Sequence, residues 1–575
     1  MNKNNLLKYY REEISFLRDE GKNFANEYPE IAKKIDISNN VMSADPQTER
    51  MIESFAFMIA GLRSKIECNT NTISRYISEA LYPGLNDVFP SCSIIQFKQN
   101  TNTNIISTFK FTKNTKLKVS IEENYEYIIS TVYPINIYPI KIDKVHINDS
   151  LQLNIEISTL LSNIEETKID DLLFYINNKV LKKSLELYNM LFHRNNIIAY
   201  VKVNNKLYNI QNDYVKLCGF NDNETIVPVP KFFNYSFQMI KDLILYPQKF
   251  LFFRIINLDK IFTSNNISNI NKFAIVFQLD KKIEVDNNCI LINAVPAVNL
   301  FPCTTEAFRM DGTKDYYKLT PSHPYKNNLE IHSIQSMYLI NKSNGEEQEI
   351  PKYFNICESN INETNDLYWL HYYNINNKED EKYISIIDTN INPNKEYLDI
   401  VYAKTLCINK ISTKYISLSS NIDLIQTENN DNKTNTDVRN VAHFITEPSE
   451  SIHNNIINND NWKLLQYLAF NKISKSNYTN IKDYLENIVN LYESQYQKLF
   501  LQVINNINKI ETKVYLKRKL INNKHCFIKN FKLIIYYNTS NINHYYFIFF
   551  KVIEKYLQNT NQFNEMLTIQ ICINK

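Results

Sequence analysis

Few residues in this 575-residue chain combine the types and the spacing that catalysis requires. Acidic residues cluster at Glu346-Glu347-Gln348-Glu349 and at Glu379-Asp380-Glu381. Paired carboxylates can act as general acid and base, but Gly345 makes the first cluster typical of a solvated turn, and the second is typical of an exposed loop. Ser91 and Ser93 have no histidine nearby in the sequence that could activate a nucleophile. We therefore predict no catalytic residue and no enzyme activity.

Metal and cofactor chemistry finds equally little support. The nine cysteines occur singly, which is typical of reduced thiols, and His525-Cys526 is the only close pair of histidine and cysteine. A zinc site needs a second pair at ligand spacing, and none exists. Only six glycines occur, and no glycine-rich phosphate loop is present. We predict no metal and no cofactor. The net charge of +3 is close to neutral, so we expect no nucleic-acid partner.

The N-terminal part of the chain is predicted to be helical. Apolar residues recur there at alternating spacings of three and four, which is the pattern of a helix that packs along its length against another helix. These residues are Leu7, Tyr10, Ile14, Leu17, Gly21, Phe24 and Tyr28. Gly21 would let a partner backbone come close. Pro29 is expected to end this helix or to begin another.

A second helix is predicted after Asp45, which can serve as its N-cap, with Pro46 as the first helical residue and Glu49 in the first turns. Its apolar residues cover more than one face, so we expect burial on two sides. They are Met51, Ile52, Phe55, Met58, Ile59, Leu62 and Ile66. The pattern fits either an ordinary three-helix core or a bundle formed with a partner.

The predicted partner interface combines residues of both helices. It comprises Leu7, Tyr10, Ile14, Leu17, Gly21, Phe24, Arg50, Phe55, Met58 and Leu62.

Beyond residue 90, runs typical of strands dominate, and several alternate apolar with polar residues as antiparallel strands do. Examples are Ile94–Phe97, Thr108–Phe111, Tyr125–Ile129, Leu151–Ile157, Ile197–Val203, Ala274–Leu279 and Phe531–Tyr537. Helical periodicity returns at Leu181–Leu191, Trp462–Phe470, Ile481–Tyr492 and Tyr546–Leu557, and Ser419–Asn440 is typical of a polar linker.

These patterns predict an elongated α+β protein of several domains. We expect a helical assembly module over 1–90, a β-rich domain over 91–310, a second β-rich domain ending in a polar linker over 311–450, and a C-terminal α/β domain over 451–575. No run approaches the roughly 20 apolar residues of a spanning helix, and residues 1–10 lack the apolar core of a signal peptide. We therefore expect a cytoplasmic protein.

Blocks of residues along the whole chain resemble one known family. They are Tyr9–Glu13, Leu17–Gly21, Phe24-Ala25, Tyr28-Pro29, Asp45-Pro46, Glu49-Arg50, Phe55–Phe57, Leu81–Pro83, Pro90-Ser91, Leu245–Pro247, Phe250–Phe253, Val295–Phe301, Tyr317–Leu319, Glu330-Ile331, Trp462–Leu465 and Asn561–Phe563. Together, in this order, they are similar to TssF, the type VI secretion baseplate family also called VasA, ImpG or IglH. Gly84 departs from the pattern, because the family is expected to have a histidine after Tyr82-Pro83.

The resemblance implies a structural role. Proteins of this family pair as two copies with one TssG subunit through an N-terminal helical bundle, and TssK and TssE join this wedge. Wedges surround the spike hub near the inner-membrane-anchored secretion complex, and the contractile sheath assembles on them. Two alternatives stay open at this point: a structural protein of a phage-like contractile tail outside type VI secretion, and a secreted effector.

Overall fold

The structure is a computed structural model of the chain. It describes residues 3–34, 46–82, 84, 87–98, 109–122, 125–160, 169–177, 181–193, 197–204, 206–230, 233, 235–265, 267, 271–310, 314–340, 345–353, 367–372, 381–388, 400–410, 413, 416–425, 441–453, 478–492, 494–521, 524–538, 544–560 and 565–574. The predicted helix at Trp462–Phe470, the N-cap residue Asp45 and most of the predicted linker lie outside the described residues.

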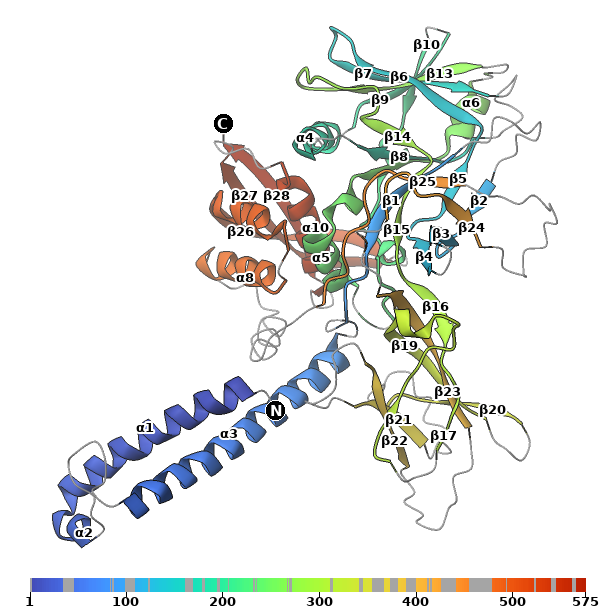
Figure 1. The fold of residues 1–575 in the computed structure, drawn as a ribbon. Helices are drawn as coiled ribbons and strands as arrows, with labels where there is room; N and C mark the ends of the chain where they lie inside the picture. The colour runs from blue at the N-terminus through green and yellow to red at the C-terminus, as the bar shows by residue number, and fades with distance from the viewer. Residues whose placement is uncertain are drawn as a thin grey trace.

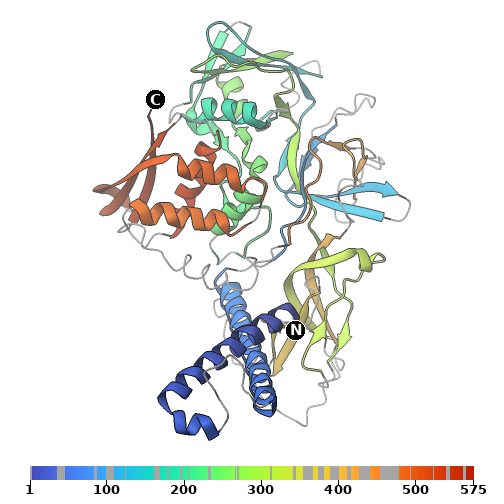
Figure 2. The same ribbon diagram turned by 60° about the vertical axis from the view of Figure 1, so that its left-hand side comes forward.

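A helical arm projects from the body of the molecule (Figures 1 and 2). It consists of α1 (Lys3–Glu27), the short α2 (Pro29–Lys34) and the long α3 (Pro46–Leu81). Pro46 is the first residue of α3, as the sequence predicts, because a proline at this position gives up no helical hydrogen bond. The first strand of the body begins about ten residues after the end of α3.

The body is built on antiparallel sheets. A closed barrel contains β1 (Cys92–Phe97), β15 (Ala294–Val298), β4 (Tyr125–Thr131), β3 (Lys116–Glu122), β24 (Ile422–Leu424) and β25 (Ala442–Phe444). A five-stranded sheet follows the order β10 (Lys206–Ile210), β9 (Ala199–Val203), β13 (Lys272–Gln278), β7 (Gln152–Thr159) and β6 (Ile140–Ile147). A four-stranded sheet follows the order β11 (Val215–Leu217), β12 (Phe252–Ile255), β8 (Leu172–Ile176) and β14 (Ile290–Ile292), and β2 (Phe109–Phe111) pairs with β5 (Ile135–Ile137).

A second group of sheets forms the distal β region. Here β16 (Phe301–Thr304), β23 (Ile400–Asn409), β19 (Leu329–Ile340) and β20 (Glu347–Ile350) form one sheet in that order, and β17 (Phe308–Arg309) also pairs with β23. A smaller sheet contains β18 (Tyr317–Lys318), β22 (Tyr383–Asp388) and β21 (Leu367–His371). This region has a hydrophobic core of its own around Met337, Trp369 and Val401.

The C-terminal part combines helices with one mixed sheet. Strand β26 (Ile507–Ile521) and β27 (Lys524–Asn538) form a long antiparallel hairpin, and β28 (Glu565–Asn574) lies parallel to β27. Helix α10 (Tyr546–Thr560) makes the crossover between the parallel strands, as such pairs require. Two more helices, α8 (Tyr478–Asn490) and α9 (Gln497–Asn505), belong to the same unit.

The main hydrophobic core joins this C-terminal unit to the body. Helix α10 packs on α5 (Ser236–Leu245), and Asn559 Nδ2 donates a hydrogen bond of 2.6 Å to Ser236 Oγ. Helix α4 (Leu181–Phe192) contributes to the same core, and α6 (Leu258–Ser264) follows β12. No residue of α1 or α3 belongs to either core among the described residues. The arm is therefore stabilised mainly by its own helices and by its base.

The predicted fold class is confirmed: helices precede β-rich antiparallel units and a C-terminal α/β unit in an elongated molecule (Figure 1). One local interpretation is wrong, because Glu347 and Glu349 lie on strand β20 and not in a turn. The four predicted domains remain a prediction, and β24 and β25 bear on it because they return from beyond residue 420 to complete the first barrel.

Candidate assembly interface

The two long helices of the arm run antiparallel and pack through small residues. Ala56 and Ala60 of α3 are fully buried and Ser64 nearly so, at a spacing of four that places them on one helix face. The half-buried residues of α1, among them Ile14 and Leu17, form the opposing face. Small side chains on α3 let the two backbones approach closely. The face of α3 that contacts α1 is therefore the one with small residues.

Ion pairs at the edges of this contact hold the register. Arg63 donates to Glu13 at 2.8 Å, lies 3.3 Å from Glu12 and places its guanidinium 5.2 Å from the centre of the Tyr9 ring. Further along, Arg18 pairs with Glu49, the acidic residue in the first turn of α3. These contacts join residues of α1 to residues far along the chain on α3, 50 positions apart for Arg63 and Glu13, and fix how the two helices face each other.

Most of the large apolar residues of α3 remain exposed. Phe55 is 52% exposed, Met58 55%, Leu62 62% and Ile66 63%. The same stripe continues with Met51 at one end and with Ile73, Ile77 and Leu81 at the other. It runs from Met51 to Leu81, about 45 Å of helix. Soluble monomers rarely expose so many large apolar side chains along one helix, which marks a site of protein contact.

The predicted interface residues fall into two groups. Tyr10, Ile14, Leu17 and Gly21 are half-buried in the contact between α1 and α3, whereas Leu7, Phe24, Phe55, Met58 and Leu62 are exposed, as is Arg50. The sequence pattern thus combined an internal seam with an external stripe. The sequence predicts that α3 is buried on two sides. Within the described part of this chain, only the side that faces α1 is buried.

Buried ion pairs anchor the base of the arm. Near the end of α3, Glu79 pairs with Lys352 and lies 2.7 Å from Nδ1 of His371. Burial alone would raise the pKa of the Glu79 carboxyl, but His371 and Lys352 hold its pKa well below the usual range. Asp87 pairs with Lys382 at 2.9 Å. Lys352 and Lys382 belong to the distal β region. These ion pairs therefore join the base of the arm to that region.

The turn between the arm and the body depends on Gly84. Its φ of +84° lies in the left-handed region, which other residues rarely adopt. The buried ammonium of Lys241, on α5, donates hydrogen bonds to the carbonyl oxygens of Gly84 at 3.0 Å and Asp87 at 2.9 Å. Burial lowers the pKa of Lys241 to about 8. Gly84, where a histidine is expected from the family resemblance, therefore has the backbone conformation that this turn uses.

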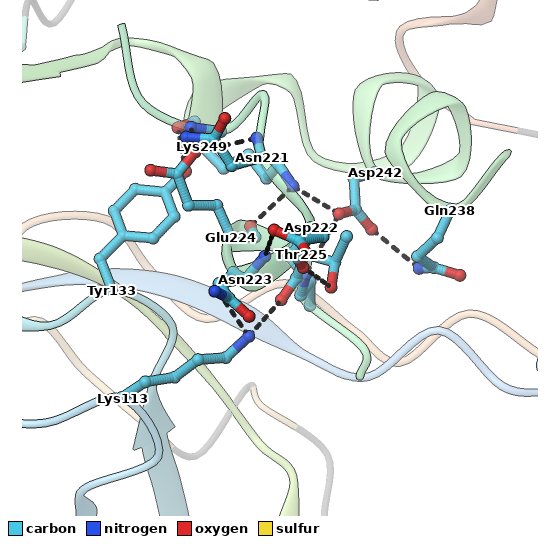
Figure 3. Close-up of polar contacts among 12 residues, drawn as sticks. Lys113, Tyr133, Asn221, Asp222, Asn223, Glu224, Thr225, Gln238, Asp242 and Lys249 are labelled. Atoms are coloured by element: carbon cyan, nitrogen blue, oxygen red, sulfur yellow. Dashed lines mark hydrogen bonds and ion pairs between the residues drawn. The ribbon is translucent and has the colours of Figure 1, made fainter. Parts of the chain in front are cut away.

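A second buried polar cluster, shown in Figure 3, includes Gln238 and Asp242 of α5. The ion pair between Asp242 and Lys249 is fully buried. The carboxylate of Asp242 also accepts from Gln238 Nε2 at 2.9 Å and from the backbone N–H of Ile226 at 3.1 Å. Lys249 Nζ donates to the carbonyl of Glu224 at 3.1 Å. Each charged atom of the pair has partners within the chain, so the cluster is suited to holding elements together.

The same cluster fixes a tight loop (Figure 3). The Glu224 carboxylate accepts from the backbone N–H groups of Gly219 and Asn221 at 2.8 and 3.1 Å. Gly219 has a φ of +97°, and a Cβ there would lie 2.9 Å from the Phe250 ring. Tyr133 OH donates to the carbonyl of Lys249 at 2.9 Å.

No cluster of metal-ligating side chains occurs among the residues that the structure describes.

The comparisons with known proteins agree on one family. A family model described as "Type VI secretion system, TssF" matches residues 2–575. The chain belongs to the TssF family. A curated type VI secretion system component, TssF1 of Pseudomonas aeruginosa, is 20% identical over 358 residues. That match covers 58% of this chain and spans 57% of the length of the relative.

Solved structures show the same fold. A chain of the TssK-TssF-TssG baseplate subcomplex of a type VI secretion system, solved by cryo-electron microscopy, matches with a TM-score of 0.70 and 14% identity, covering 91% of this chain and 96% of the other. A chain of the baseplate complex from the type VI secretion system matches with a TM-score of 0.54 and 13% identity, covering 98% and 96%. At these identities the likeness shows that this chain and the two solved chains share a fold.

Proposed function

We propose that this TssF-family chain is a structural subunit of the type VI secretion baseplate wedge. In this role it forms part of the platform that surrounds the spike hub and on which the contractile sheath assembles. The observation that carries the proposal is the family match over residues 2–575. The fold shared with chains of two baseplate structures supports it.

The arm is the proposed site of wedge assembly. Its exposed stripe of Phe55, Met58, Leu62 and Ile66 offers apolar side chains at helical spacing, which fits helices of a TssG-like subunit and of a second copy of this chain. Leu7, Phe24 and Arg50 also occupy exposed positions of α1 and α3. Tyr10, Ile14, Leu17 and Gly21 contribute indirectly, because they hold α1 against α3. An obligate interface of this type buries on the order of 2,000 Å² or more.

The remaining partners follow from the wedge role. The proposal includes a TssK-like subunit, by analogy with the solved TssK-TssF-TssG subcomplex, and also a TssE-like subunit and the spike hub. It includes no nucleic acid and no cofactor. The chain would work in the cytoplasm and be recruited to the inner-membrane-anchored secretion complex. No helix in the described part of the chain is long and apolar enough to cross a bilayer.

A non-enzymatic role accords with the chemistry of the buried clusters. Asp242 and Lys249 are fully buried, pair with each other and have further hydrogen-bond partners, and Glu79 pairs with Lys352 and contacts His371 at the base of the arm. Carboxylates that serve as general acids or bases need room for a substrate within hydrogen-bond reach. These groups instead join elements that are distant in the sequence.

Co-expression with the TssG-like subunit, followed by native mass spectrometry of the purified assembly, tests the proposal. We expect two copies of the 68.0 kDa chain for each TssG-like subunit. Exposed apolar stripes on isolated arms should also make the chain alone prone to non-specific association. Recovery of this chain without the TssG-like subunit, when both are expressed and soluble, would contradict the wedge assignment.

A further inference from the structure

Charge is unevenly distributed along this nearly neutral chain. The hairpin of β26 and β27, residues 507–538, contains seven lysines and one arginine but a single acidic residue, Glu511. Residues 301–400, which supply most of the distal β region, contain sixteen acidic and nine basic residues. The net charge of +3 therefore hides a strongly basic hairpin and a segment, residues 301–400, that is acidic in sequence. Half of the acidic residues of this segment are described, and three of them, Glu346, Glu347 and Glu349, lie together at β20. Opposite fields on two surfaces steer and orient protein association.

The basic hairpin also exposes large apolar side chains. Leu516 is 70% exposed and Phe527 67%, and Val514 and Tyr515 are exposed beside them, next to the exposed cations Lys513 and Arg518. Strand β26 is an edge of its sheet, and β28 pairs with β27 only from Lys529 onward. Lysines alone would protect such an edge from pairing with another chain. The neighbouring apolar side chains instead indicate a surface that a partner covers.

The acidic segment presents a matching surface at β20. This strand is also an edge of its sheet, with β19 as its partner, and Glu346, Glu347 and Glu349 are all exposed on it or beside it. Tyr353, a few residues further on, is 46% exposed and lies edge-on to Tyr368 at 5.9 Å. Carboxylates with an exposed aromatic ring complement ammonium and guanidinium groups with exposed leucine and phenylalanine.

The two surfaces cannot meet within one molecule. Figure 1 shows the β26–β27 hairpin and strand β20 on opposite sides of the chain. A second copy can bring them together, because a contact between two different patches of identical chains is a head-to-tail contact that repeats from copy to copy. We propose that the basic β26–β27 hairpin of one copy docks onto the acidic β19–β20 hairpin of a second copy of this chain. This contact is separate from the arm and does not depend on it.

A charge-swap experiment on the full-length chain tests this contact. All proteins carry Phe55→Asp and Leu62→Asp, so that association through the arm does not contribute. Variant H adds Lys513→Glu and Arg518→Glu, and variant T adds Glu347→Lys and Glu349→Lys. Sedimentation velocity over a concentration series gives the dissociation constant. Since all four positions are exposed, circular dichroism melts should match those of the parent.

We expect the parent to self-associate at 0.1 M salt and to do so at least about tenfold more weakly at 1 M, where the screening length falls to about 3 Å. Variants H and T should each associate at least about tenfold more weakly than the parent, because the substituted side chains then face residues of the same charge. An equimolar mixture of H and T should regain association, and so should one chain with all four substitutions, because each restores opposite charges.

The proposal is overturned if the parent is monomeric at every concentration, if H and T associate as the parent does, or if their mixture stays as weak as either alone. Binding of the parent, but not of H, to phosphatidylglycerol vesicles without self-association would also overturn it and would assign the hairpin to an anionic membrane. The variants should still co-purify with the TssG-like subunit when the arm is left intact. If only the variants with Phe55→Asp and Leu62→Asp lose the TssG-like subunit, that result bears on the proposed wedge assembly and not on this contact.

Discussion

At the base of the arm, single buried side chains determine how the molecule is held together. Asp87 illustrates this: burial alone would raise the pKa of its carboxyl, but Lys382, then His332, lower it to about 2. The ring of His332 lies among Asp87, Lys382 and Lys241 and is fully buried. Burial lowers the pKa of this histidine from its usual 6.5 to about 4. The junction therefore holds a neutral imidazole between paired charges.

This arrangement predicts acid sensitivity. Between about pH 6.5 and 4 the unfolded chain binds a proton on His332 and the folded chain does not, so stability is lost as the pH falls through this window. The carboxyls of Glu79 and Asp87 have depressed pKa values and add to the loss at lower pH. We expect the urea midpoint to fall between pH 7 and 4.5, corresponding to at most about 3 kcal/mol from His332.

The variant His332→Phe should remove most of this slope, because a phenyl ring does not titrate. His193→Phe, at an exposed histidine, serves as the control and should leave the slope as in the parent. An unchanged pH dependence of the urea midpoint in His332→Phe would show that the junction is not the acid-sensitive part.

Sequence reasoning found some of these residues and missed others. Gly84 was singled out only because it departs from a family pattern, and the structure supplies the reason, a positive φ. Lys241 and Lys249 gave no signal, because a buried lysine cannot be distinguished in sequence from an exposed one. The partners of Lys241 also lie far away in the chain, such as Asp87, which is 154 positions from it.

Among the elements, the arm shows most clearly how local packing prepares a surface. Ala60 is fully buried where α3 meets α1, whereas the neighbouring Gly61 has open space where a Cβ would be. The small residues hold the helices close together and turn the large residues of α3 outward. The stability of the arm and its exposed stripe therefore come from different faces of one helix.

Two substitutions at adjacent positions should act in opposite directions. Ala60→Leu forces a larger side chain into the contact between the helices and should destabilise the arm by about 1–3 kcal/mol. Gly61→Ala should stabilise it by about 0.5–1 kcal/mol, because alanine favours the helix and meets no neighbour within 4 Å. Amide hydrogen exchange in peptides from 46–66 measures both effects. Equal exchange in the two variants would contradict the proposed packing.

Periodicity predicted elements well where one face was buried and the other exposed. Helix α4 and strands β1, β7, β9 and β13 lie where alternation or helical spacing indicated them. Helix α5 escaped detection because all of its ten residues are buried, including Lys241 and Asp242, so no face is polar. Strand β26 and the first half of β27 were also missed, since their lysines interrupt the apolar pattern.

At the scale of the whole molecule, the family blocks and the exposed surfaces serve different purposes. Phe250, Phe252 and Val295 belong to blocks that resemble the family, and all are fully buried in the main core. Such blocks reveal the fold, and the family match over residues 2–575 accords with that. The basic hairpin and the acidic distal region could not be placed from sequence, because an overall charge of +3 says nothing about where charges gather.

The central claim is that the exposed stripe of α3 binds the TssG-like subunit. The most direct measurement compares recovery of that subunit with the parent, with Phe55→Asp/Leu62→Asp and with Leu207→Asp, a control at a position of β10 that is 51% exposed. Buried hot-spot residues contribute about 2 kcal/mol or more each, so the double variant should bind at least about 100-fold more weakly and the control as the parent does. A folded double variant that binds the TssG-like subunit as the parent does would contradict the account.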